Sequence, residues 1–162
     1  MNEQDMRPAV CIVYVLLQCL VHAECPLGWH HYGDSCYYFS TEALSWYNAE
    51  MSCRGHNARL AEVETKAQSD YLIDMAKRLG RNNHYWLGGR DDVVEGTWTW
   101  ASSDMQFTFT AWGPGEPNGQ TAQNCLSMYT FLNYLWSDDP CSTLMLFICE
   151  KKFPDSDGQI IG

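Results

Sequence analysis

Six cysteines spread between residues 25 and 149 constrain the fold of this 162-residue chain more than any other feature. An even number of cysteines in a small exported chain indicates a disulfide framework. Six cysteines allow many pairings, so their spacing alone leaves the connectivity open. Cys25 and Cys36 lie at the ends of a short segment that a bridge could close, and Cys125 and Cys141 flank two segments that a bridge could join.

Export is indicated by residues 1–23, which are predicted to be a signal peptide. Residues 9–20 form an apolar run of the length found in signal peptides, too short to cross a membrane comfortably. A membrane anchor is the alternative, because Arg7 is the only basic residue before this run. Cleavage would remove Cys11 and Cys19 and leave the six cysteines of the mature chain. We therefore expect a secreted, extracellular protein without a membrane span.

The composition limits the classes of function. The net charge of −10 disfavours nucleic acids and anionic membranes as main partners. The chain contains no H-E-x-x-H motif, no nucleophile elbow and no phosphate-binding glycine loop. A framework that uses all six cysteines also leaves no catalytic thiol. We therefore expect a binding protein and not an enzyme.

Two helices are predicted in the first half of the chain. Residues 44–53 carry apolar residues at helical spacing, and Gly55 would end that helix. Thr65 and Gln68 form a capping-box pattern at the start of a second helix, which Gly80 would end. The apolar stripe of the second helix is expected to consist of Ala67, Tyr71, Leu72, Met75 and Leu79.

Short strands are predicted around these helices. Residues 28–39 are rich in aromatic and turn residues and indicate a hairpin. Further strands are expected at residues 85–89, 97–100, 126–129, 133–136 and 144–149. This order gives an α+β domain in which both helices cover one side of a small antiparallel sheet. The domain is expected to span residues 24–152 and to be followed by a disordered tail at residues 153–162.

Residues 102–123 lack regular apolar spacing, and a segment of this length within a compact domain is usually functional or disordered. It contains Glu116-Pro117-Asn118, in which a cis bond before the proline would turn a carboxylate and an amide oxygen to one side of a tight loop. Ser137 and Asp138 offer a hydroxyl and another carboxylate further along. Oxygen ligands of this kind suit Ca²⁺, and an incomplete shell leaves positions for two vicinal sugar hydroxyls.

From Cys25 to Lys151 the chain resembles a C-type lectin domain in its long form. The motifs that carry the resemblance are Cys25…Cys36, Trp46…Cys53, Trp86-Leu87-Gly88, Glu95-Gly96…Trp98-Thr99-Trp100, Glu116-Pro117-Asn118, Asn124-Cys125, Trp136-Ser137-Asp138 and Phe147-Ile148-Cys149-Glu150. Within that family, the single small secreted domain is most similar to invertebrate lectins of the perlucin-like kind. The resemblance implies a disulfide-stapled double-loop fold whose binding loop is residues 102–123. It also implies the bridges Cys25–Cys36, Cys53–Cys149 and Cys125–Cys141.

The resemblance further implies a calcium-dependent sugar site. The residues that would contact the sugar are Glu116, Asn118, Gln123, Ser137 and Asp138, and all of these except Ser137 would bind the metal. Glu-Pro-Asn is the family's mannose-type signature, whereas Gln-Pro-Asp would suggest galactose. Strong sites in the family carry Glu in place of Gln123 and Asn in place of Ser137. We therefore expect weak calcium binding, towards about 10⁻⁴–10⁻³ M.

Two further features flank this site in the sequence. Asp91 and Glu95, with Asn124 as a partner, suggest an auxiliary calcium site, and an ordinary acidic turn is the alternative. Trp98 is expected in the core, whereas Trp112 lies beside the binding loop, where an aromatic ring can pack on the face of a sugar.

These features together predict a secreted, calcium-dependent lectin that prefers mannose-like glycans. It would act in innate recognition of microbial glycans and would gain avidity as an oligomer. The alternative is an extracellular matrix or biomineral-associated protein that keeps the same fold and acidic surface without binding sugar.

Overall fold

The computed structural model describes residues 24–153, so the predicted signal peptide and residues 154–162 lie outside the described residues. The strands are β1 (His30–Tyr32), β2 (Ser35–Phe39), β3 (Arg59–Leu60), β4 (Tyr85–Arg90), β5 (Thr99–Trp100), β6 (Cys125–Tyr129), β7 (Leu135–Asp139) and β8 (Leu146–Lys152). The helices are α2 (Trp46–Gly55) and α3 (Lys66–Leu79), with short 3₁₀ turns η1 (Gln120–Ala122) and η2 (Thr130–Leu132). The α+β class is confirmed.

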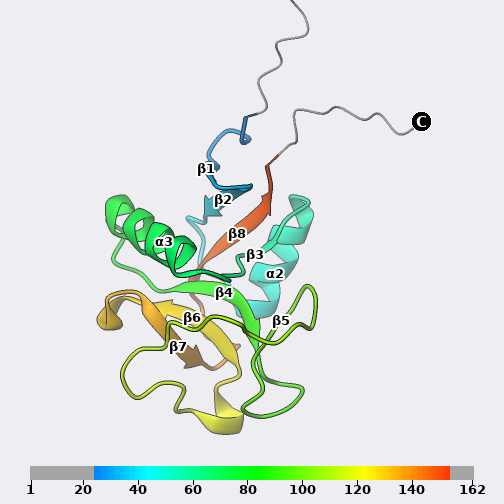
Figure 1. The fold of residues 1–162 in the computed structure, drawn as a ribbon, viewed down its shortest axis with the longest axis vertical. Helices are drawn as coiled ribbons and strands as arrows, with labels where there is room; N and C mark the ends of the chain where they lie inside the picture. The colour runs from blue at the N-terminus through cyan, green and yellow to red at the C-terminus, as the bar shows by residue number, and fades with distance from the viewer. Residues whose placement is uncertain (1–23, 154–162) are drawn as a thin grey trace, which may run out of the picture.

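One mixed sheet runs through the molecule, with strands in the order β1-β2-β8-β4-β6-β7 (Figure 1). β3 adds to β8, and β5 adds to β4. All pairs are antiparallel except β4 and β8, which pair in parallel from Tyr85↔Leu146 to Trp86↔Phe147. The sheet is thus mixed rather than antiparallel throughout. A long connection separates β4 from β8, and parallel pairing requires such a connection.

The two helices lie on opposite sides of the central strands, with α3 and α2 flanking β2 and β8 in Figure 1. Tyr85 and Leu87 of β4 point into the core that includes Leu72 of α3. Trp86, between them, points into the second core, which includes Trp46 of α2. The prediction that both helices cover one side of the sheet is wrong, because β4 is apolar on both faces and each face needs a cover.

The ends of α3 are those that the sequence predicts. The Thr65 hydroxyl accepts the Gln68 backbone N–H at 3.2 Å, and Gly80 adopts a left-handed conformation with φ of 63°. The predicted stripe differs in detail, because Ala67 is exposed and Ser69 and Ala76 are buried instead.

The start and end of α2 differ slightly from the prediction. Leu44 precedes the helix and bridges to Met145, whereas Gly55 is the last helical residue and His56 caps the end. Trp46 anchors the helix, because its indole N–H donates to the Leu87 carbonyl of β4 at 2.8 Å.

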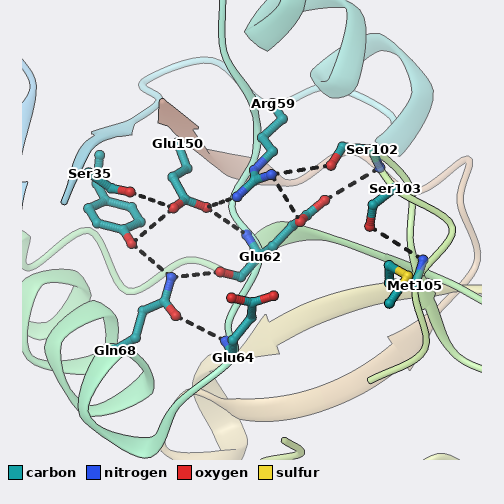
Figure 2. Close-up of polar contacts among 10 residues, drawn as sticks. Ser35, Arg59, Glu62, Glu64, Gln68, Ser102, Ser103, Met105 and Glu150 are labelled. Carbon is teal, nitrogen blue, oxygen red and sulfur yellow. Dashed lines mark hydrogen bonds and ion pairs between the residues drawn. The ribbon is translucent and has the colours of Figure 1, made fainter. Parts of the chain in front are cut away.

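A polar network centred on the buried Glu62 and Glu150 ties β2 and β8 to the segment before α3 (Figure 2). Glu150 of β8 accepts hydrogen bonds from the Ser35 hydroxyl at 2.7 Å and from the Glu62 backbone N–H at 3.2 Å. Arg59 lies between the carboxylates of Glu62 and Glu150, at 3.3 and 3.5 Å. The Glu62 carboxylate also accepts the Ser102 backbone N–H, so the network reaches the start of the long loop.

The long loop has no strand between β5 and β6, as predicted, but it is anchored on Trp136 of β7. Backbone hydrogen bonds join Trp136 to Ala111 and Gly113, each at 2.8 Å. The rings of Phe107 and Trp112 pack edge-on against the Trp136 indole, with centroids 5.4 and 5.7 Å away. The loop therefore owes its order to aromatic packing as well as to hydrogen bonds.

Three disulfides complete the fold: Cys25–Cys36, Cys53–Cys149 and Cys125–Cys141. These are the bridges that the family resemblance implies. The predicted strand at 133–136 starts later, at Leu135, because Asn133 and Tyr134 both have positive φ angles of 57° and 65°. Within residues 24–153, no helix has the length and apolarity needed to cross a membrane.

Candidate calcium and ligand site

Glu116 lies at the tip of the long loop, and its peptide bond to Pro117 is cis. Its Oε2 atom is buried and has no hydrogen-bond partner among the described residues. Burial, and next the neighbouring Asp138 carboxylate, raise the pKa of Glu116 to about 7. A carboxylate oxygen without a donor, beside a second carboxylate, is an environment that a cation would stabilise.

Asp138 holds the loop to β7. Its side chain is buried, and its two carboxylate oxygens accept the backbone N–H groups of Asn118 and Gly119 at 2.8 and 2.7 Å. The strand places this side chain because β7 is paired with β6 through Leu126↔Asp138. The backbone of Glu116-Pro117-Asn118 is thus fixed to a residue that lies about twenty positions further along the chain.

Asp91 and Glu95 come from the turn after β4 and lie near the same carboxylates. Asp91 is buried, and its Oδ2 accepts the Gly96 backbone N–H at 2.9 Å, whereas its Oδ1 has no partner among the described residues. Burial, and next the Asp138 charge, raise the pKa of Asp91. The Asp91 backbone N–H donates to the Asn124 carbonyl at 3.2 Å, and the Asn124 side-chain Oδ1 is also buried without a partner.

A hollow of about 410 Å³ brings most of these groups together. It is lined by Asp91, Glu95, Gly96, Trp98, Pro117, Asn118, Gln120 and Asp138. The structure therefore gathers the predicted auxiliary pair, the asparagine of the triplet and the aspartate of β7 around one space.

Glu116, Gln123, Asn124 and Ser137 lie outside the lining of this hollow. The Gln123 side chain folds over Gly119, where a Cβ atom would overlap it, so this close approach requires glycine. The Ser137 hydroxyl is buried and donates to the backbone carbonyl of Asp138 at 3.3 Å. That hydrogen bond uses one lone pair of the Asp138 carbonyl and leaves the other for a metal.

Sequence reasoning missed Gln120 and Asp139. Gln120 lines the hollow and has a positive φ of 46°, for which the sequence carries no clear signal. Asp139 accepts the Ser127 hydroxyl at 2.6 Å, and burial raises its pKa. The adjacent aspartates at the end of a predicted strand were the available clue to Asp139.

The donor set fits an oxygen-liganded cation. Three of the buried side-chain oxygens without a hydrogen-bond partner in the described part of the chain are carboxylate or amide acceptors: Glu116 Oε2, Asp91 Oδ1 and Asn124 Oδ1. Among residues 24–153, no group of three or more His, Cys, Asp or Glu side chains is arranged to hold a metal. A cation here would therefore depend on amide and water oxygens as well as carboxylates, and Ca²⁺ accepts such a mixture.

Comparison with known proteins decides the family. The model of the lectin C-type domain matches residues 42–151. The chain belongs to the C-type lectin domain family. Perlucin from Haliotis laevigata is 39% identical over 79% of this chain and 83% of its own length. A perlucin-like protein from Mytilus galloprovincialis is 28% identical over 82% of this chain and 86% of its own length.

Solved C-type lectin structures share the fold. The carbohydrate-recognition domain of the mouse scavenger receptor C-type lectin superposes with a TM-score of 0.73 at 26% identity, covering 81% of this chain and 98% of its own. A calcium-independent type II antifreeze protein superposes equally well, at 29% identity over 83% of this chain and 99% of its own. Family membership supports carbohydrate binding as the general activity of this C-type lectin, and members of the family are generally binding proteins rather than enzymes.

Proposed function

We propose that this C-type lectin is a secreted protein that binds mannose-like glycans with the help of Ca²⁺. The observation that carries the proposal is the Glu116 carboxylate, which lies beside Asp138 with a buried oxygen that has no donor. The metal would be held by Glu116, Asn118 and Asp138, with Asp91, Glu95 and Gln123 as further candidates. When bound, Ca²⁺ would supply positions for two adjacent sugar hydroxyls.

Hydrogen-bond direction supports the preference for mannose. The ionised Glu116 side chain is acceptor-only, whereas the Asn118 amide can donate through its NH₂ group and accept through its oxygen. A vicinal pair of hydroxyls, which can each donate and accept, finds both kinds of partner at one site. Because the Asp138 carboxylate holds the backbone of Asn118, the segment that carries the two side chains is positioned before the sugar arrives.

Exchanging the two residues tests this geometry. Glu116→Gln combined with Asn118→Asp reverses the donor and acceptor positions, so we expect preference to move from mannose to galactose. The measurement is calcium-dependent retention on a mannose resin, with free mannose and free galactose as competitors. The pair Glu42→Gln and Asn83→Asp makes the same chemical changes at exposed positions away from the site and should change nothing. Equal elution of the wild type by both sugars would contradict the proposal.

One observation favours a second candidate, a biomineral-associated protein. Residues 82–149 carry seven acidic side chains and a single basic one, Arg90. The acidic residues are Asp91, Asp92, Glu95, Asp104, Glu116, Asp138 and Asp139. A stretch with this excess of acidic side chains suits a calcium-rich solid. Adsorption to calcite that is unaffected by mannose, together with failure to bind the mannose resin, would favour this candidate.

Secretion, avidity through oligomers and a role in recognising microbial glycans belong to the same proposal. A single monosaccharide site on this pattern should bind with about millimolar affinity. Several sites presented together would raise the effective affinity without new contacts. Light scattering of the mature protein with and without calcium tests whether such an assembly forms.

A further inference from the structure

We propose that a hollow beside the last residues of β8 binds an anionic polysaccharide, one that carries sulfate or carboxylate groups. The hollow has a volume of about 330 Å³ and is lined by Asn57, Ala58, Arg59, Glu150, Lys151 and Lys152. β8 ends at Lys152, at the opposite end of the molecule from the long loop between β5 and β6 (Figure 1). Binding there would not require the calcium site.

The hollow arises where β3 and β8 separate. β3 pairs with β8 over two residues, and its first pair is Arg59↔Glu150. Just before Arg59 the chain turns away towards α2, because Asn57 has a positive φ of 51°. β8 continues past the pair as far as Lys152. The path of the backbone therefore leaves an open space beside the end of β8.

Two consecutive lysines give this space its charge. Lys151 and Lys152 have no acidic side chain within 4.0 Å in the part of the chain that the structure describes. Basic residues on the helices differ, because Arg54, Lys66 and Arg78 each pair with a carboxylate one turn away. The positive charge of the two lysines is therefore available to an anionic ligand.

The carboxylate in the lining is already occupied. Glu150 is 4% exposed, and it accepts the Ser35 hydroxyl and the Glu62 backbone N–H. The Arg59 guanidinium lies 3.5 Å from Glu150 and also pairs with Glu62 at 3.3 Å. Arg59 thus offsets the charge of these buried groups, and the net attraction for an anion comes from the two lysines.

Lys151 is held in place before a ligand binds. Its Nζ lies 4.3 Å from the centroid of the Trp29 ring and donates to the His56 carbonyl at 3.4 Å. An ammonium group has three N–H donors, so two remain for a sulfate or carboxylate oxygen. A ligand therefore spends little affinity on ordering this side chain.

A single polysaccharide chain fits this hollow better than an extended anionic surface does. The net charge of the chain is −10, so a membrane surface would meet the acidic remainder of the molecule as well. A flexible chain can contact one end alone, since charges more than about 8 Å away are largely screened at physiological ionic strength. The exposed Asn57 amide in the lining both donates and accepts, which suits the hydroxyl groups between the anionic groups of a polysaccharide.

Calorimetric titration of the protein in chelator with a heparin octasaccharide tests the inference. If two lysines displace counterions from a linear polyanion, affinity should fall about fivefold between about 50 and 150 mM NaCl. Lys151→Gln combined with Lys152→Gln should weaken binding at the lower salt by at least about fivefold and remove most of the salt dependence. Lys66→Gln combined with Lys77→Gln makes the same charge change at exposed positions outside the lining and should change affinity less than about twofold.

Further ligands separate the chemistries. Hyaluronan carries carboxylates without sulfate, so binding of heparin alone would assign the hollow to sulfated chains, and binding of both would include carboxylated chains. No binding of either polysaccharide, or an equal loss in the two double variants, would overturn the inference. Equally tight binding of poly-L-glutamate would show that the hollow takes any polyanion, and the assignment to a polysaccharide would be wrong. Because chelator removes calcium, these results stand apart from the test of mannose binding.

Discussion

At Glu116, burial and a neighbouring negative charge both oppose ionisation, and they raise the pKa of this carboxyl to about 7. The protonated and ionised forms of this side chain are therefore present in similar amounts in the calcium-free fold at about pH 7. Calcium requires the ionised side chain, so protons and metal compete for the same group. The pKa of Asp91, which lines the hollow beside Asp138, is raised in the same direction by burial and by the Asp138 charge.

Because of this competition, the stability of the calcium-free protein and its affinity for calcium should depend on pH in opposite directions. Without calcium, the contribution of Glu116 to stability is fully present below its ordinary pKa and is lost as pH rises through about 7. Calcium affinity should instead fall by roughly tenfold for each pH unit below about 7, because a proton must leave Glu116 before the metal binds. Urea unfolding in chelator and calorimetric calcium titration, each between about pH 5 and pH 8, measure the two effects.

Glu116→Gln isolates the contribution of this residue. The variant should lose calcium binding. Its free energy of unfolding, measured in chelator, should decline less than that of the wild type as pH rises. The difference between the two proteins removes the contributions of Asp91, Asp139 and Glu62, whose pKa values are also raised. It also removes the contribution of His84, whose pKa is lowered by burial. Identical pH slopes in both proteins would contradict the role assigned to Glu116.

Among the elements, β4 decides where the site can lie. It is buried on both faces, pairs with β8 on one edge and with β6 on the other, and ends at the turn that carries Asp91. Gly89 lets the long loop cross close to this strand. A Cβ there would meet Phe107 Cζ at 2.5 Å and Leu126 Cδ2 at 2.8 Å.

Gly89→Ala should therefore destabilise the fold by overpacking, by about 1–3 kcal/mol. Gly55→Ala is the matched control, because a Cβ at the last residue of α2 meets nothing within 4 Å. The control should be neutral or should gain up to about 1 kcal/mol from helix propensity. Equal urea midpoints for Gly89→Ala and the wild type would show that Phe107 and Leu126 can move aside without a loss of stability.

Elements that depend on neighbouring residues could be predicted from the sequence, and those that depend on distant partners could not. The capping of α3 by Thr65 and Gly80 involves only adjacent residues, and the prediction is confirmed. The parallel β4–β8 pair joins residues about sixty positions apart, and no local pattern indicates it. β3 was not predicted for the same reason. Its two residues form a strand only by pairing with the distant β8.

The same distinction applies to the site. The sequence shows Glu116-Pro117-Asn118 and Asp138 as motifs. It does not show which carboxylate oxygens already accept a hydrogen bond, because that depends on the contacts of Asp138. Its carboxylate accepts two backbone N–H groups from the loop, which the sequence could not show. The side-chain packing of Gln123 on Gly119 likewise follows from the path of the loop and not from residue type.

At the scale of the whole molecule, β1 and the end of β8 lie at one end of the fold, and the long loop between β5 and β6 lies at the other (Figure 1). Residues 82–149, which include the loops, carry seven acidic side chains and one basic one, and they contain most of the irregular backbone of the described residues. Calcium would therefore act where self-repulsion is greatest and where regular hydrogen bonding is least. With millimolar calcium over a sub-millimolar site, the expected gain in unfolding free energy is about 1–2 kcal/mol.

The two larger disulfides should separate overall stability from the integrity of the site. Cys53–Cys149 spans 96 residues and joins α2 to β8 in the core, so its replacement by alanines should cost roughly 4–5 kcal/mol on the chain-entropy model. Cys125–Cys141 spans 16 residues, for which the same model gives about 3 kcal/mol.

The second bridge, however, closes the segment that contains Asp138, so its loss should loosen the carboxylate that holds the binding loop. We expect calcium affinity to fall at least about tenfold in the Cys125→Ala, Cys141→Ala pair, and to change little in the folded fraction of the Cys53→Ala, Cys149→Ala pair. Urea unfolding and calcium titration on the same preparations measure both quantities, and an equal loss of calcium affinity in the two double variants would show that the site depends on the whole fold rather than on its local bridge.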